Sequence, residues 1–474
     1  MTNLPTHYSD RIDKVLLRHR YGIPIFLVIM YLMFWVTFKL GSPFVSLLEL
    51  FFSWLLRFIN HHWSHQTWPL LQSLVTDGFI SGVGGVLVFV PNIILLFFFI
   101  ALLEKSGAMG RAARVLDSAM DKVGLHGKSF VPLLMGFGCS VPAMMATSIV
   151  QNKRDRLATI FVIPLMSCSA RFPIYMLFIP AVFTPKWHAP VLWAIYFFGL
   201  ILALLTARVL SSTVLRHVDC DEPPIELIPW NLPTLSELFR EAFKQAWFYI
   251  RKAGTVILGF SVLLWALSIF PIDNQDKSPA EKIEHSYAGH IGHFMEPMLK
   301  PAGMDWKIGT ALIGAVAAKE VFVVQLGIVN SISSKDGENT GMLRNHVRNQ
   351  YAPLSALCIM IFCLIGVPCM SSMVMSARMS ESFKWTIFQF VSLTTLAWIV
   401  TVLIYQTGTL FMTFTRAEIL NLSEWLILVF LLAISLIIVY RRVVAPLISA
   451  RCSKDTNVCN CPLAEYCQKK KNIK

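Results

Sequence analysis

The sequence predicts an all-α, polytopic membrane protein, and its composition supports this fold class in three ways. Hydrophobic residues make up 55% of the 474 residues, charged residues make up 15%, and the mean hydropathy is +0.60. Soluble proteins carry about 25% charged residues, so this chain lacks the polar side chains needed to cover a water-facing surface of its size. The composition excludes secreted, disordered, coiled-coil and nucleic-acid-binding proteins.

Eight apolar stretches are long enough to cross about 30 Å of hydrocarbon. They cover residues 22–40, 86–103, 157–183, 190–210, 254–270, 354–377, 384–405 and 424–440. Two more, 130–150 and 308–330, are apolar and rich in Gly and Ala, but the first contains Cys139 and the second contains Lys319 and Glu320. We interpret these two as re-entrant or broken helices, because irregular backbone at membrane depth occurs only where it packs in protein or lines a cavity.

The distribution of charge predicts the orientation. An even number of full spans places both termini on one side of the membrane. Of the 41 Lys and Arg residues, 28 lie in segments on that side and 11 in the opposite loops. Basic residues collect in cytoplasmic loops, so both termini are predicted to be cytoplasmic. This bias also accounts for the net charge of +13 without a nucleic-acid partner.

Two segments outside the spans are predicted to lie at membrane surfaces. Segment 41–77 is interpreted as an outer interfacial amphipathic segment, and segment 236–252 as an amphipathic helix on the inner surface. The predicted interfacial anchors are Trp54, Trp63 and Trp68. The outer segment also contains His61, His62 and His65, which are either metal ligands or solvated polar residues.

Two blocks, beginning at residues 86 and 254, share an order of parts. Each has a span, a polar helix, a Gly-containing turn, a broken apolar segment and a second span. In the predicted orientation, the first block enters the membrane from outside and the second from inside. Such inverted repeats are typical of secondary transporters with a substrate site near the midplane. The alternative is chance similarity between two pieces of a helical membrane protein.

Three cysteines lie beside predicted helix breaks at membrane depth: Cys139, Cys168 and Cys369. Helix breaks free backbone carbonyls, and thiolates suit soft metal ions such as Fe, Zn or Cu(I). Glu320 is an intramembrane carboxylate, a residue type that is usually functional. The alternatives are packing for each cysteine and a buried ion pair for Glu320. We expect structural roles for Lys319 and Arg171, and packing roles for Cys358 and Cys363.

The last residues form a basic tail with four thiols. They are Cys452, Cys459, Cys461 and Cys467. Four thiols in a reducing compartment suggest a metal or Fe–S site, although the spacing matches no standard frame. The alternative is a disordered tail with spare thiols. The motif GLHGKS at 124–129 lacks the first glycine of a phosphate-binding loop, so no nucleotide site and no enzyme activity are predicted.

Long ordered runs of residues resemble the FeoB family of bacterial ferrous-iron transporters. They include DGFISGVGGVLVFVPNI at 77–93, GKSFVPLLMGFGCSVPAMMAT at 127–147 and RDRLATIFVIPLMSCSARFPIYMLF at 154–178. The second half matches at RKAGTVIL, GMDWKIGTALIGAVAAKEV and VPC. The resemblance implies two gate modules around a core and the transport of Fe²⁺, with no tightly bound cofactor.

The resemblance also implies site residues. Cys139, Cys168 and Cys369 correspond to the membrane cysteines proposed to handle Fe²⁺ in the family, and Glu320 falls in the AAKEV motif. Ser140 stands where Asn is common and can still offer an oxygen. With the gate modules included, the chain divides into seven parts. They are 1–21 (cytoplasmic segment), 22–77 (first transmembrane helix and outer segment), 78–183 (first gate module), 184–253 (connecting and amphipathic helices), 254–380 (second gate module), 381–440 (C-terminal transmembrane helices) and 441–474 (Cys-rich tail).

The family typically begins with a cytoplasmic GTPase domain, and this chain starts where the linker after that domain would end. We therefore expect a separate cytoplasmic G protein and a small FeoA-type protein as partners, in a bacterial inner membrane; a homo-oligomer is left open. Two alternatives remain at this point. One is a transporter of another divalent metal or a nucleoside-like solute on the same gate architecture. The other is a non-transporting, metal-sensing membrane subunit.

Overall fold

The computed structural model describes residues 2–3, 13, 19–63, 68–80, 84, 87–88, 90–121, 123–216, 230–271, 279–330 and 339–414. Over these residues the chain is helical, apart from a two-residue antiparallel pairing of β1 (Thr2–Asn3) with β2 (Asn231–Leu232). The predicted all-α fold is confirmed. The predicted span at 424–440 and the Cys-rich tail lie outside the described residues.

The α-helices follow one another with short connections. They are α2 (His19–His62), α3 (Pro69–Ser73), α5 (Val90–Lys105), α6 (Ala108–Asp121), α7 (Phe130–Met135), α8 (Ser140–Ala146), α9 (Lys153–Val162), α10 (Phe172–Val182), α11 (His188–Ser212), α12 (Leu235–Tyr249), α13 (Thr255–Ile269), α14 (Pro279–Glu284), α15 (Tyr287–Leu299), α16 (Trp306–Ala317), α17 (Val321–Val329), α18 (Asn339–Gln350), α19 (Pro353–Ile365), α20 (Met370–Met379) and α21 (Phe383–Phe414). The 3₁₀ segments are η2 (Gly127–Ser129), η3 (Thr147–Ile149), η4 (Ile163–Leu165), η5 (Ser169–Arg171), η6 (Pro185–Trp187) and η8 (Lys300–Ala302), and the π-helical segments are η1 (Leu74–Ile80) and η7 (Ile250–Gly254).

Five helical stretches of the described chain are long and apolar enough to cross a membrane. They are Pro24–His62, Lys153–Val182, Pro185–Ser212, Pro353–Met379 and Phe383–Leu410. A sixth forms if α5 and the start of α6, which are bent by 76° at their junction, count as one span. The number differs from the eight predicted spans because α13 has only 15 residues, α5 needs α6 to reach span length, and 424–440 is not described.

Helix α2 is much longer than predicted. It has 44 residues, which at 1.5 Å per residue is about 66 Å, or about twice the hydrocarbon thickness. Residues 41–62, predicted as part of an outer interfacial segment, continue the same helix without interruption; their placement at the outer surface stays a prediction. Gly41 does not stop the helix: a Cβ at this position would overlap Asn92 Oδ1 on α5, so glycine here allows two helices to approach closely.

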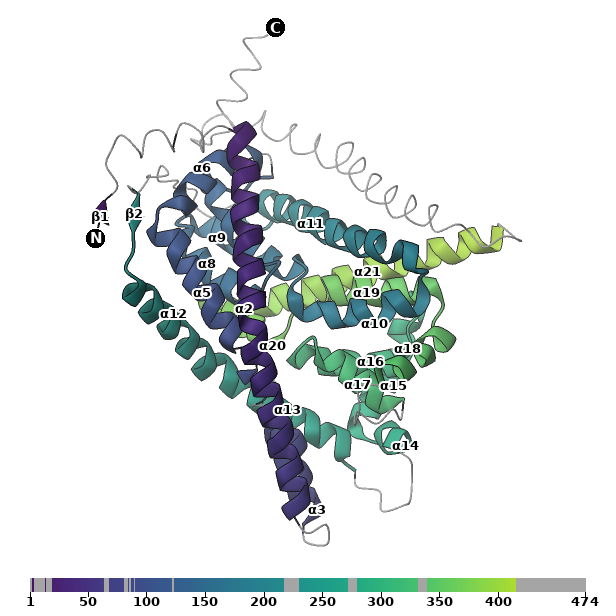
Figure 1. The fold of residues 1–474 in the computed structure, drawn as a ribbon. Helices are drawn as coiled ribbons and strands as arrows, with labels where there is room; N and C mark the ends of the chain where they lie inside the picture. The colour runs from purple at the N-terminus through teal and green to yellow at the C-terminus, as the bar shows by residue number, and fades with distance from the viewer. Residues whose placement is uncertain are drawn as a thin grey trace.

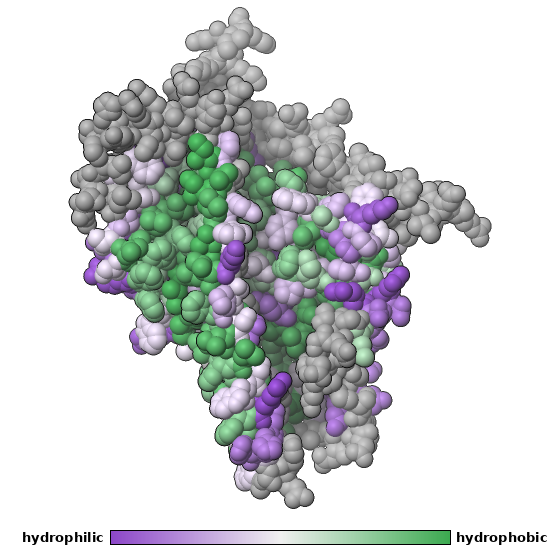
Figure 2. Space-filling model, in the orientation of Figure 1, coloured by the Kyte–Doolittle hydropathy of each residue, from purple (hydrophilic) through white to green (hydrophobic). Residues whose placement is uncertain are grey.

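Two groups of helices make up the molecule (Figure 1). In this view α2, α5, α12 and α13 descend along one side, and α5 packs against both α2 and α12. Helices α10, α11, α19 and α21 lie across the view, and α19 packs against α10, α11 and α21. Hydrophobic side chains cover much of the visible face (Figure 2). Large apolar side chains of α2 such as Leu47, Leu50 and Trp54 are exposed. Such a surface suits contact with lipid tails.

Segment 236–252 forms a helix, as predicted, but it packs along α5 and continues through η7 into α13. Its buried side chains are Leu238, Ala242 and Ala246. Its exposed large apolar side chains are Leu235, Phe239, Phe243 and Trp247. Placement of this helix at the inner membrane surface stays a prediction.

Candidate functional site

Four helices of the described chain are interrupted, and the interruptions lie in two pairs. The two stretches predicted as broken helices are confirmed, with breaks at 136–139 between α7 and α8 and at 318–320 between α16 and α17. The predicted spans 157–183 and 354–377 are also broken, at 166–168 between η4 and η5 and at 366–369 between α19 and α20, next to Cys168 and Cys369 as predicted. Glycine or proline lies in or near three of these breaks, and both residue types weaken helices; the break at 318–320 consists of Ala318, Lys319 and Glu320.

Each predicted cysteine occupies the residue just before a helical segment that follows a break. Cys139 precedes α8, Cys168 precedes η5 and Cys369 precedes α20, and all three have extended backbone conformations. Ser140 is the first residue of α8, and Glu320 directly precedes α17. All five of these residues therefore lie at helix starts beside interrupted backbone.

The structure brings predicted site residues of the two gate modules together. The Cys139 side chain lies within electrostatic range of Cys168, Cys369 and Glu320. Helix α8, which follows Cys139, packs against α20, which follows Cys369. Cys168 is buried, whereas Cys139 and Cys369 are partly exposed. Within the part of the chain that the structure describes, no three His, Cys, Asp or Glu side chains form a group that could hold a metal ion, so the thiols form a loose cluster.

Side chains of the first module satisfy the carbonyl groups that its breaks release. Ser169 donates from Oγ (2.9 Å) and from its backbone N–H (3.2 Å) to the Gly138 carbonyl, which joins the two breaks of this module. Arg171, whose side chain is 2% exposed, donates to the Met166 carbonyl (2.7 Å) and the Pro164 carbonyl (2.6 Å). These bonds fit the structural role expected for Arg171, because buried carbonyls need donors.

Lys319 joins the two breaks of the second module. Its Nζ donates to the carbonyls of Gly366 (3.0 Å) and Cys363 (3.3 Å), and its side chain is 2% exposed. The adjacent Val367 has a φ of 51°, a conformation that β-branched residues adopt only under strain. Lys319 therefore fits its expected structural role, and the side chains that remain for binding an ion are the thiols, Ser140 and Glu320.

Close packing fixes the first break in position. A Cβ at Gly136 would lie 2.9 Å from the Cβ of Met166, and a Cβ at Gly138 would overlap the ring of Phe34 on α2. Both glycines are needed because neighbouring side chains fill the space where a larger residue would sit.

A buried polar network missed by sequence reasoning supports the second break of the first module. Gln389 on α21 donates to the carbonyls of Ile160 (2.8 Å) and Phe161 (3.1 Å), near the end of α9. Its Oε1 accepts a hydrogen bond from Ser376 on α20 (2.5 Å). The available signal was a glutamine in an otherwise apolar predicted span, since such polar residues usually form interhelical hydrogen bonds.

An ion pair joins three distant parts of the sequence, away from the cysteine cluster. Arg111 on α6 donates to both carboxylate oxygens of Asp13, at 2.6 Å and 3.0 Å. Trp230 donates its indole N–H to Asp13 (2.9 Å), and the Arg111 guanidinium lies 4.2 Å from the centre of its ring. Partial burial opposes ionisation of Asp13, but its hydrogen bonds to Arg111 and Trp230 and the charges of Arg111 and Arg114 outweigh burial and hold its pKa below the usual value.

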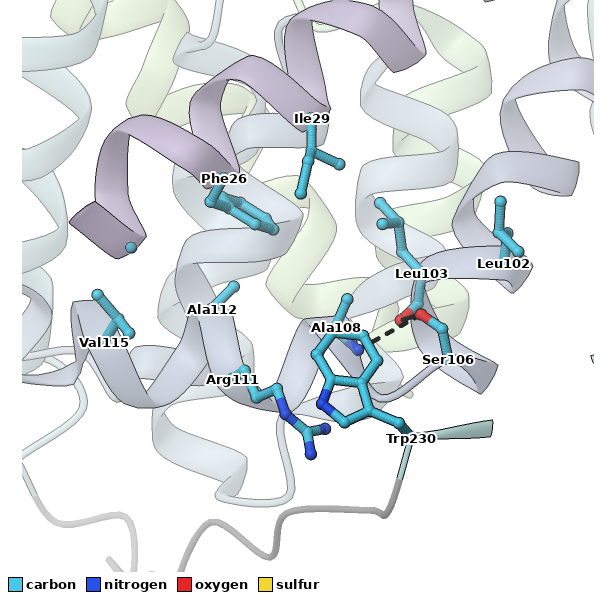
Figure 3. Close-up of a pocket in the computed structure, with 11 residues that line it drawn as sticks. Phe26, Ile29, Leu102, Leu103, Ser106, Ala108, Arg111, Ala112, Val115 and Trp230 are labelled. Carbon is cyan, nitrogen blue, oxygen red and sulfur yellow. Dashed lines mark hydrogen bonds between the residues drawn. The ribbon is translucent and has the colours of Figure 1, made fainter. Parts of the chain in front are cut away.

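A cavity of about 250 Å³ lies beside this ion pair (Figure 3). Its lining residues are Gly22, Phe26, Ile29, Leu102, Leu103, Ser106, Ala108, Arg111, Ala112, Val115 and Trp230. The lining comes from α2, the elbow between α5 and α6, and the residue preceding β2. The cavity is almost entirely apolar, with Ser106, Arg111 and Trp230 as its polar members, and it contains no predicted site residue.

Of the other predicted metal candidates, only the two histidines of α2, His61 and His62, lie within the described residues. His61 and His62 are adjacent in the last turn of α2, with ring centres 5.2 Å apart, and the His62 Nδ1 lies 3.0 Å from the Phe58 carbonyl. His65 and the four tail cysteines lie outside the described residues. Metal binding by either group stays a prediction.

Comparison with known proteins identifies the architecture. The family Gate (Nucleoside recognition) matches residues 86–181 and 250–383, two stretches that overlap the two predicted modules. An Fe(2+) transport protein A/Fe(2+) transporter FeoB fusion protein of Porphyromonas gingivalis is 38% identical over 442 residues. The Fe(2+) transporters FeoB of Campylobacter jejuni and Staphylococcus aureus are each 39% identical, over 397 and 411 residues. No solved structure shows significant similarity.

These alignments cover most of this chain but only part of each relative. They include 85%, 83% and 85% of the chain, and 52%, 64% and 60% of the respective relatives. The chain thus spans between half and two thirds of the length of the curated relatives that it matches. Its two matching gate stretches, its helical fold and its identity of 38–39% to these relatives make the chain similar to the helical membrane part of FeoB proteins.

Proposed function

We propose that this chain is the permease part of a ferrous-iron importer in a bacterial inner membrane, and that Fe²⁺ passes between the two gate modules. The observation that carries this proposal is that Cys139 at a helix break of the first module lies within electrostatic range of Cys168, Cys369 and Glu320, while α8 packs against α20 of the second module. The FeoB relatives, which are Fe(2+) transporters by name, support the same substrate.

Each residue of the cluster has a distinct proposed role. Cys139 and Cys369 are transient ligands from opposite modules, and Cys168 is a neighbouring thiol. Glu320 balances the charge of the ion, and the Ser140 hydroxyl offers an oxygen. Soft thiolates favour Fe²⁺ over Mg²⁺ and Ca²⁺. Loose coordination by several ligands permits release, which a transport path requires.

Orientation and partners belong to the same proposal. Both termini face the cytoplasm, as the charge bias indicates. A small FeoA-type protein is the first partner, supported by the fusion of such a protein to FeoB in Porphyromonas gingivalis. A separate cytoplasmic G protein is the second, supported by the resemblance to the family. The ten cysteines of the chain make it sensitive to oxidation, so transport is best assayed without oxygen.

The test is anaerobic Fe²⁺ uptake into proteoliposomes that contain the full chain. We expect uptake that Cys139→Ala and Cys369→Ala each reduce at least tenfold. Cys358→Ala is the matched control, because Cys358 is a fully buried thiol on α19 that bonds only to the Thr401 carbonyl among the described contacts. Uptake that is unchanged in both variants would refute the cysteine path. No uptake even after addition of a G protein and a FeoA-type protein would refute Fe²⁺ transport.

The family description favours one alternative substrate, because it names nucleoside recognition. Competition distinguishes the two: Co²⁺ and Mn²⁺ reduce Fe²⁺ uptake if the path carries divalent metals, whereas nucleosides reduce it if the path carries nucleoside-like solutes. A metal-sensing role for the tail is distinguished by deletion of residues 441–474. A transporter keeps its flux after this deletion, whereas a sensor loses its response.

A further inference from the structure

A histidine at the surface of the second gate module is held between two carboxylates. The Nδ1 atom of His293 lies 3.4 Å from Oε2 of Glu296, and its Nε2 atom lies 3.8 Å from Oε1 of Glu284. His293 and Glu296 lie on α15, and Glu284 is the last residue of α14. In Figure 1 α14 lies at the end of the molecule opposite to α6. This group is separate from the thiol cluster, and the proposed path does not use it.

The arrangement around the His293 ring is the one found at metal-binding histidines. Such a histidine donates one ring N–H to a carboxylate or carbonyl, which fixes the tautomer and directs the other nitrogen at the metal. In the tautomer that carries its proton on Nδ1, Glu296 accepts from Nδ1 and the Nε2 lone pair faces Glu284. Metal–nitrogen and metal–oxygen bonds are about 2.1 Å long, so one ion can contact both Nε2 and Glu284 Oε1 across 3.8 Å.

Packing restricts the His293 ring to this orientation. The ring stacks on Trp306 with centres 4.5 Å apart and an interplanar angle of 25°. The two helices that carry these residues approach closely, because a Cβ at Gly292 would overlap Thr310 Oγ1 and would lie 2.8 Å from the Trp306 carbonyl oxygen. The site remains accessible, since the side chains of His293, Glu284 and Glu296 are 40%, 48% and 34% exposed.

We propose that His293 and Glu284 form a divalent-cation capture site, in which Glu296 positions the imidazole and water completes the coordination. Two protein ligands are consistent with the finding that no three-residue metal group occurs in the described chain. Few ligands also give weak binding, which lets an ion move on.

The role of this site in transport rests on the proposed function. Segment 271–307 lies on the predicted outer side, so the site would concentrate Fe²⁺ at the start of α16. That helix has 12 residues, or about 18 Å at 1.5 Å per residue, and its other end is the break that contains Lys319 and Glu320. The capture site and the break are thus the two ends of one helix.

Trp306 provides an optical probe of this site. We would titrate the full chain in lipid nanodiscs with Co²⁺, which quenches nearby tryptophan fluorescence, and measure total bound Co²⁺ in parallel. The chain has 13 tryptophans, so the Trp306 signal is the difference between the parent chain and Trp306→Phe. We expect Trp306→Phe to bind as much Co²⁺ as the parent but to lose a saturable component of quenching.

Substitutions of the ligands test the assignment. We expect His293→Gln and Glu284→Gln to abolish the Trp306 component, and Glu296→Gln to weaken its Co²⁺ affinity about tenfold, as loss of a supporting carboxylate does. The matched controls are His346→Gln on α18 and Glu49→Gln on α2, both exposed, which should leave the titration unchanged. An identical Trp306 component in the parent, His293→Gln and Glu284→Gln would overturn the proposal. Binding is measured without transport, so this outcome is distinct from a failure of Fe²⁺ uptake.

Discussion

Lys319 Nζ lies 3.0 Å from the carbonyl oxygen of Gly366 and thereby connects the break between α16 and α17 to the break between α19 and α20. A second bond, to the Cys363 carbonyl, completes the connection. In the first module, Ser169 connects the two breaks in the same way, through the Gly138 carbonyl. In each module, a side chain at one break therefore donates a hydrogen bond to a backbone carbonyl at the other break. This bond stabilises the pair of breaks.

We expect Lys319→Met to destabilise the second module. The substitution keeps the aliphatic length of the side chain but leaves two buried carbonyls without a donor, at a cost of about 1–3 kcal/mol each. The midpoint of thermal unfolding in detergent should fall, and Fe²⁺ uptake should fall with it. Lys300→Met is the control, because Lys300 is exposed in η8 and its loss should change neither quantity. Equal unfolding midpoints for the two variants would contradict the role given to Lys319.

Gly138→Ala should disturb the first break through Phe34. The added methyl overlaps the Phe34 ring, and overpacking of this kind costs about 1–3 kcal/mol. Phe34→Leu should restore part of the loss in the double variant, because it removes the atoms that clash. Gly259→Ala on α13 is the control: its methyl meets no atom within 4 Å, so stability should stay the same or rise. Additive effects of Gly138→Ala and Phe34→Leu would show that the two residues do not interact.

Gln389→Leu should weaken the packing of α21 on the first module. The change removes the bonds to the carbonyls of Ile160 and Phe161 and the partner of Ser376. Interhelical hydrogen bonds in membrane proteins contribute about 0.6 kcal/mol each and up to about 1.7, so a total loss of about 1–2 kcal/mol is expected. Equilibrium unfolding in mixed detergent micelles measures it. Gln406→Leu, at an exposed position on the same helix, should lower the free energy of unfolding clearly less than Gln389→Leu.

The contact between Asp13, Arg111 and Trp230 should make stability depend on acid pH. The folded-state pKa of Asp13 lies below its usual value, so folding favours the ionised carboxylate. This contribution is fully present above the ordinary Asp pKa of about 3.9 and is lost as the pH falls through the lower folded-state pKa. Unfolding midpoints measured from pH 7 to pH 3 should fall more steeply for the parent than for Asp13→Asn. Parallel profiles would show that Asp13 contributes nothing through its charge.

Sequence reasoning located the breaks better than the helix lengths. Glycine and proline next to Cys139 and Cys369 predicted interrupted backbone, and the structure has it at both. The first span was expected to end at residue 40, yet α2 continues through Gly41 and Pro43. The role of Gly41 depends on tertiary structure, because this glycine leaves room for the Asn92 side chain on α5. The local sequence does not reveal this contact between α2 and α5.

The partners of the site residues were also beyond local patterns. The sequence identified Lys319 and Arg171 as costly intramembrane charges, but the carbonyls that they bind depend on how the breaks pair. Gln389 bonds to the carbonyl of Ile160, 229 positions earlier in the chain. Asp13 bonds to Arg111 and Trp230, which lie 98 and 217 positions later. Such contacts follow from the packing of whole helices, which periodicity and composition do not specify.

Ser169 and Arg171 bond only within the first module, and Lys319 bonds only within the second, at the breaks. The cysteine cluster, in contrast, includes residues of both modules. A shift of one module relative to the other would preserve these hydrogen bonds but would strain the network in which Gln389 bonds both Ser376 of the second module and Ile160 of the first. Such a shift would change the distance between Cys139 and Cys369, because the two residues belong to different modules. The affinity for an ion bound by both thiols would then depend on the distance between the modules. Ion binding and the relative position of the modules would therefore be coupled.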